Sequence, residues 1–173
     1  TTLAKTIYNN FERIFEGRSF LANVREVIAH QPITGLVGLL EQLLNDILKS
    51  KDPIKVDSVE VGIDMIRARL FCKRALVIID DADDLQQLKA IAGARDWFGP
   101  GSRIVITTRN KHLLEQVGVD SIYMAEEMDE KEALELWHAF ESDYPNQEYL
   151  DLESDYPNQE YLDLSKRVIR YCQ

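Results

Sequence analysis

Residues 75–81 read Ala-Leu-Val-Ile-Ile-Asp-Asp, so five consecutive apolar residues lead directly into Asp80 and Asp81. A continuous apolar run of this length is typical of a strand buried on both faces of a parallel sheet. Ligands of open α/β sheets bind at the carboxyl ends of the strands, and Mg²⁺ at nucleotide phosphates takes one or two carboxylates. We therefore expect Asp80 to hold Mg²⁺ and Asp81 to orient or deprotonate an attacking water. The alternative is a strand that simply runs into a solvated acidic turn.

The segments around this run alternate between strand and helix patterns, which favours an α/β fold with a parallel sheet and helices on both faces. A loop is expected between the first strand and Pro32. The spacing of apolar residues predicts strands over 19–24, 74–79, 103–107 and 121–124, and helices over 2–15, 36–48, 59–70, 85–92, 111–117 and 129–140.

Two further segments belong with the acidic pair. Arg109 follows the predicted strand 103–107, so it also lies at a strand tip, where a cation can meet a terminal phosphate. A surface arginine paired with a nearby acid is the other interpretation. Thr1 and Thr2 open the first helix, and a P-loop, GxxxxGK[ST], ends in a hydroxyl that binds Mg²⁺ and runs into a helix.

The composition of the chain argues against some classes of binding partner. The 173 residues carry a net charge of −10, which argues against nucleic acid or an anionic membrane surface as a partner. No apolar run approaches the ~20 residues of a membrane helix, so no membrane insertion is expected. Cys72 and Cys172 lack metal-ligand spacing; we expect them to be buried, in a protein of a reducing compartment.

Several segments, in order, resemble the NB-ARC domain of plant disease-resistance receptors of the NBS-LRR class. TTLAKTIYN is similar to the end of the P-loop and its helix, and ALVIIDDADD to the kinase-2 (Walker B) motif. GSRIVITTRNKHLL resembles the signature with the sensor arginine, and EALELWHAF the one after it. FLANVRE and the acid at Asp83 resemble the subclass with an N-terminal TIR module.

The resemblance implies an α/β fold of the P-loop NTPase type and a molecular switch that is ADP-bound at rest, ATP-bound when active, and slow in hydrolysis. Asp80 and the hydroxyl of Thr1 correspond to the Mg²⁺ ligands. Thr2 and Arg109 correspond to residues that contact the phosphates. Asp81 corresponds to the carboxylate beside the attacking water. The implied partners are the TIR and leucine-rich-repeat domains of the same receptor, with self-association on activation, in the cytoplasm or also the nucleus.

The sequence also departs from the family. The P-loop glycines and lysine, and the strand before them, are not present. We expect that strand to lie between those ending at Asp80 and near Thr107, so that the chain alone folds poorly and does not bind nucleotide at micromolar levels. The expected division is a partial nucleotide-binding subdomain over 1–140, two identical copies of ESDYPNQEYLDL over 141–164, and the start of a helical segment over 165–173.

Two other functions stay open at this stage. One is a phosphoryl-transfer enzyme on the same fold, which would need an acceptor pocket with polar residues of its own. The other is an interaction scaffold that has kept the fold and lost the nucleotide.

Overall fold

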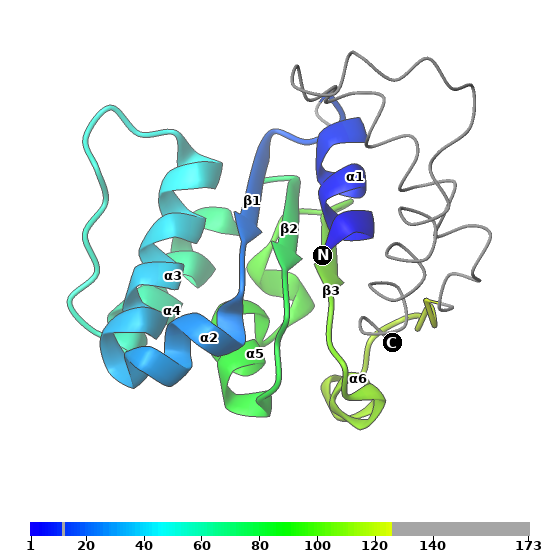
Figure 1. Ribbon diagram of the computed structural model, residues 1–173. Coiled ribbons are helices and arrows are strands. Elements are labelled where there is room, and N and C mark those ends of the chain that lie inside the picture. The colour runs from blue at the N-terminus through cyan, green and yellow to red at the C-terminus, as the bar shows by residue number, and fades with distance from the viewer. Residues whose placement is uncertain (12, 126–173) are drawn as a thin grey trace, which may run out of the picture. The chain divides into compact units, whose positions relative to one another are not determined.

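The computed structural model describes residues 1–11 and 13–125 (Figure 1). The chain divides into the units Thr1–Ile122 and Tyr123–Gln173, and the first is described below. Its elements are α1 (Thr2–Asn10), β1 (Gly17–Leu21), α2 (Val24–His30), α3 (Pro32–Leu48), α4 (Val59–Leu70), β2 (Ala75–Ile79), α5 (Leu85–Ala92), the 3₁₀ turn η1 (Arg95–Trp97), β3 (Arg103–Ile106) and α6 (Lys111–Val117).

The three strands form one parallel sheet in the order β1-β2-β3. Gly17 lies opposite Ala75 in the first pair, and Leu76 lies opposite Arg103 in the second. All five residues of β2 are buried, as expected for the central strand of a covered sheet. The expected α/β fold with a parallel sheet is confirmed.

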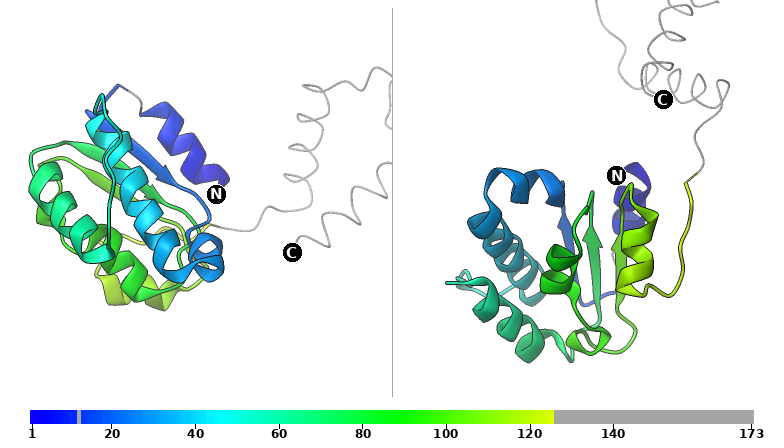
Figure 2. Two further views of the ribbon diagram at one scale, coloured as in Figure 1. Left: turned by 90° about the vertical axis from the view of Figure 1, so that its left-hand side faces the viewer. Right: turned by 90° about the horizontal axis from the view of Figure 1, so that it is seen from below.

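Helices cover both faces of the sheet. Alternate residues of β2 point to opposite faces, and each set joins a different apolar cluster. Ala75, Val77 and Ile79 belong to the larger cluster, with residues of α2 to α6. Leu76 and Ile78 belong to the smaller one, with Ala4 of α1. The left-hand view of Figure 2 shows α1 on one side of the sheet and the other helices opposite.

The structure corrects several expectations about secondary structure: α1 ends at Asn10 and not at residue 15, α3 begins at Pro32 and not at residue 36, and two segments have another structure than the one expected. Residues expected to form a loop before Pro32 form α2, where Val24 and Ile28, one helical turn apart, are both buried. Residues 121–124, expected to be a strand, form no strand, and Tyr123 is largely exposed. An apolar run becomes a strand only where a neighbouring strand completes its hydrogen bonds, and none of the described strands pairs with this segment.

The expected position of the missing strand is also wrong. β2 and β3 pair directly, with Val77 opposite Ile104 and Ile79 opposite Ile106, so no further strand separates them. The ladder between these two strands is intact, which removes the physical reason given for poor folding. Arg103 of β3 is exposed and the other three residues are only half-buried, because no described strand pairs with the other edge of β3.

The remaining expectations concern the two cysteines, membrane insertion and the segments after residue 125. Cys72 is exposed, contrary to expectation, because it lies in the turn between α4 and β2. Among the described residues, no helix is long and apolar enough to cross a bilayer. Cys172, the predicted helix over 129–140, the repeat over 141–164 and the segment 165–173 lie outside the described residues.

Candidate functional site

The backbone of Asp80 and Asp81 continues the line of β2 beyond its last residue. The Asp80 N–H donates to the carbonyl of Leu21 at 2.9 Å, and the Asp80 carbonyl accepts from Val24 N–H at 2.9 Å. The Asp81 carbonyl accepts from Arg25 N–H at 3.1 Å. The junction between β1 and α2 therefore holds both acids in place from one side.

The end of β3 holds the acids from the other side. Thr107 Oγ1 accepts from the Asp81 N–H at 2.9 Å and donates to Asp80 Oδ1 at 2.7 Å. Asp81 has a φ of 56°, in the left-handed region that aspartate adopts more readily than most residues. The chain leaves the strand direction at this residue, so the two carboxylates have different surroundings.

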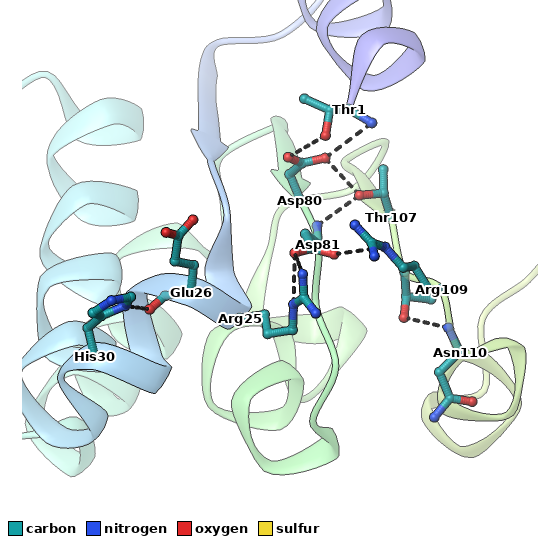
Figure 3. Close-up of polar contacts among 10 residues, drawn as sticks. Thr1, Arg25, Glu26, His30, Asp80, Asp81, Thr107, Arg109 and Asn110 are labelled. Carbon is teal, nitrogen blue, oxygen red and sulfur yellow. Dashed lines mark hydrogen bonds and ion pairs between the residues drawn. The ribbon is translucent and has the colours of Figure 1, made fainter. Parts of the chain in front are cut away.

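Asp80 is a fully buried carboxylate at the tip of β2, surrounded by hydroxyl groups (Figure 3). Thr107 donates to Oδ1, and Thr1 Oγ1 donates to Oδ2 at 3.0 Å. A buried charge is tolerated only with such partners.

The balance of these contacts decides the ionisation of Asp80. Burial by itself raises the pKa of its carboxyl group, whereas the hydrogen bonds from Thr107 and Thr1 lower it. The pKa of Asp80 therefore lies below its ordinary value. Asp80 is a carboxylate at neutral pH and can serve as a cation ligand.

Asp81 is in contact with arginines instead of hydroxyls. Its Oδ2 accepts from Arg25 Nε at 3.0 Å, and Arg25 Nη2 lies 2.9 Å from the same oxygen. Its Oδ1 lies 3.9 Å from Arg109 Nε. The side chain of Arg109 is 84% exposed, so it can move toward a ligand at little energetic cost.

The oxygen donors of the site fit Mg²⁺. Asp80 Oδ2 and Thr1 Oγ1 are hard oxygen ligands 3.0 Å apart. Within the part of the chain that the structure describes, no three His, Cys, Asp or Glu side chains gather into a metal cage. One carboxylate and one hydroxyl suit an ion that takes its remaining ligands from water and phosphate oxygens, as Mg²⁺ does beside nucleotides.

Four of the residues singled out from the sequence lie together at this edge of the sheet: Thr1, Asp80, Asp81 and Arg109 (Figure 3). Thr2 begins α1 next to them.

Sequence reasoning missed two residues of this site. Thr107 directly follows the apolar run of β3, at the strand tip where Asp80 and Arg109 were also expected, and this position could have identified it. Arg25 carried no such signal, since its contact with Asp81 crosses between segments 56 positions apart.

Comparison with known proteins identifies the family. The pattern of the NB-ARC domain matches residues 1–145 of the chain. The chain belongs to the NB-ARC domain family. NB-ARC domains are nucleotide-binding domains, which agrees with an edge of the sheet that joins a buried carboxylate, hydroxyls and an exposed arginine.

The relatives of this NB-ARC domain are plant disease resistance proteins. Disease resistance protein RUN1 of Vitis rotundifolia is 43% identical over 175 residues, which cover 100% of the chain and 12% of RUN1. Disease resistance protein RPV1 of the same plant is 42% identical over 100% of the chain and 11% of its own length. TMV resistance protein N of Nicotiana glutinosa is 34% identical over 86% of the chain and 13% of its own length. The chain thus spans a small part of each.

Thr107→Val should destabilise the NB-ARC domain, because valine has the shape of threonine without the hydroxyl. Asp80 Oδ1 would lose its 2.7 Å donor, and the Asp81 N–H would lose its acceptor. Leaving buried polar groups unsatisfied costs about 1–3 kcal/mol, which urea unfolding would measure. Thr107→Ser keeps the hydroxyl and should remain within about 0.5 kcal/mol of the unmodified protein. Equal stability of all three proteins would contradict this account of Thr107.

The effect of Thr107→Val should also depend on pH. The pKa of Asp80 is lowered in the folded state, so ionisation stabilises the fold above the unfolded pKa of about 3.9. That contribution is lost as the pH falls through the lower folded pKa. The difference in free energy of unfolding between Thr107→Val and the unmodified protein should therefore shrink in acid. A difference that grows in acid would contradict this role of the Thr107 hydroxyl.

Proposed function

We propose that this NB-ARC domain is the ADP- and ATP-binding switch of a plant disease-resistance receptor, ADP-bound at rest and ATP-bound when active. The observation that carries the proposal is that the buried Asp80, bonded to the hydroxyls of Thr1 and Thr107, lies at the same carboxyl edge of the sheet as Arg109, whose Nε is 3.9 Å from the neighbouring Asp81. A nucleotide that binds together with its metal ion needs a negatively charged ligand for the metal and a positively charged group for the phosphates.

The proposed roles follow from the contacts. Asp80 and Thr1 would hold Mg²⁺, which neutralises phosphate charge when it is bound. Thr2, at the start of α1, would contact a phosphate, because backbone N–H groups at a helix start attract anions. Arg109 would reach the terminal phosphate and so distinguish ATP from ADP. Asp81 would orient the attacking water.

Hydrolysis by this site is proposed to be weak, serving as the reset of the switch. The chain by itself, without the P-loop glycines and lysine, is proposed to be inactive and not to bind nucleotide at micromolar levels. The proposed division of the chain is a partial nucleotide-binding subdomain over 1–140, a duplicated connection over 141–164 and the start of a helical segment over 165–173.

The receptor is proposed to be of the TIR subclass, with leucine-rich repeats as another domain of the same protein. Support comes from the similarity to disease resistance proteins and from Asp83 in the ALVIIDDADD segment. We also propose that the receptor associates with itself on activation, and that it is located in the cytoplasm or also in the nucleus.

Arg109→Ala in the full-length protein tests the switch. It should weaken binding of Mg²⁺-ATP about tenfold, as expected for the loss of one charge-assisted contact, and leave ADP affinity unchanged. Titration calorimetry with both nucleotides measures this. Arg103→Ala is the matched control, because Arg103 lies at the opposite end of β3 and its side chain donates only to the neighbouring Ser102 carbonyl among the described residues.

Each alternative function predicts a different result. Binding of neither nucleotide by the unmodified full-length protein would indicate the interaction scaffold. Rapid turnover with a small-molecule phosphoryl acceptor would indicate the metabolic enzyme. Equal loss of ADP and ATP affinity in Arg109→Ala would contradict the sensor role.

A further inference from the structure

Arg25 contacts Asp81 through both its backbone and its side chain. It lies in the first turn of α2, where its N–H donates to the Asp81 carbonyl at 3.1 Å. Its guanidinium places Nε at 3.0 Å and Nη2 at 2.9 Å from Asp81 Oδ2 (Figure 3). Three contacts from one residue therefore fix the backbone and the carboxylate of Asp81 together.

The contacts divide the two oxygens of Asp81 between different neighbours. Both guanidinium nitrogens of Arg25 face Oδ2. Oδ1 lies 3.9 Å from Arg109 Nε, which is beyond hydrogen-bond length. Oδ1 is thus the oxygen turned toward the arginine at the end of β3 and able to accept a hydrogen bond from water.

We propose that Arg25 is a positioning residue for hydrolysis: it holds Oδ2 of Asp81 so that Oδ1 faces the water that attacks the terminal phosphate. The proposal rests on the proposed function of the site. Arg25 does not contact the water itself; it fixes the orientation of the Asp81 carboxylate, which does. It also connects the start of α2 to the site, so a shift of α2 would change hydrolysis.

The ion pair of Arg25 with Asp81 is partly exposed, so a role in positioning can be told apart from a role in stability. Arg25 is 43% exposed and Asp81 23% exposed, and ion pairs of this kind contribute little to the free energy of unfolding. The rate of a chemical step, in contrast, responds strongly to a displacement of about 1 Å in a reacting group. Loss of Arg25 should therefore appear in the rate and only weakly in the stability.

Arg25→Ala in the full-length protein should lower kcat for Mg²⁺-ATP hydrolysis about tenfold and leave KM and ADP affinity unchanged. Arg25→Lys keeps the charge but lacks the paired N–H donors, so kcat should recover only in part. Arg69→Ala is the matched control, since Arg69 is an exposed arginine on α4, and its kcat should equal that of the unmodified protein.

The outcomes separate this inference from the proposed function. Nucleotide binding with an unchanged kcat in Arg25→Ala would overturn the positioning role alone. A parallel loss of kcat, ADP affinity and stability in both Arg25 variants would also overturn it, because the role would then be structural. Absence of nucleotide binding by the unmodified protein would overturn the proposed function instead.

Discussion

Asp80→Asn should lower Mg²⁺-dependent ATP hydrolysis by the full-length protein about 100-fold, the largest loss that we expect from a single change at the site. Asparagine keeps the shape of the side chain but removes the negative charge that attracts the cation. A metal ion supplies several kcal/mol of charge stabilisation to phosphoryl transfer, and each 1.36 kcal/mol corresponds to a factor of ten. Steady-state phosphate release at several Mg²⁺ concentrations would measure the loss.

The matched control for this variant is Asp83→Asn, which removes an exposed carboxylate three positions further along the chain. Its hydrolysis should stay within about twofold of the unmodified protein, because surface substitutions change free energies by about 0.5 kcal/mol or less. High Mg²⁺ should partly restore Asp80→Asn if the variant binds the ion weakly. Full activity of Asp80→Asn at low Mg²⁺ would remove Asp80 from the metal site.

The tasks proposed for the two adjacent acids differ, and so do the surroundings of their side chains. Asp80 is buried and accepts hydrogen bonds from two hydroxyl groups. Asp81 is partly exposed and held by the arginines Arg25 and Arg109. The left-handed backbone at Asp81 separates the two carboxylates, so the acid pair of the sequence becomes two distinct environments.

Elements whose ends are set by local chemistry could be predicted from the sequence. α4, α5 and α6 have the predicted bounds, and a side chain caps the start of each. Ser58, Asp84 and Asn110 accept hydrogen bonds from N–H groups of the first turn. β2 could be predicted because its burial on both faces leaves a continuous apolar run.

Features set by contacts between distant segments could not be predicted. The direct pairing of β2 with β3 depends on the order of strands, which no local pattern records. Arg25 reaches Asp81 only because β1 lies beside β2 and α2 begins at the same edge. The segment 121–124 has the apolar composition of a strand without a described strand to pair with.

The second large effect that we expect is on stability, from Leu40→Ala in α3. Leu40 is fully buried, and it packs against α4 where Gly62 lacks a side chain: a Cβ there would lie 2.7 Å from Leu40 Cδ1. Truncation would leave a cavity between two closely packed helices, and such changes cost about 2–5 kcal/mol. Urea unfolding followed by circular dichroism would measure the shift.

Ile33→Ala is the matched control, since Ile33 lies on the same helix and is 74% exposed. It should change the free energy of unfolding by about 0.5 kcal/mol or less. Because α3 packs on β1, and Leu21 at the end of β1 accepts from the Asp80 N–H, loss of this packing should also loosen the site. Nucleotide affinity of Leu40→Ala should therefore fall at temperatures below its unfolding transition. An affinity that stays unchanged up to the transition would show that the β1–Asp80 contact holds without α3.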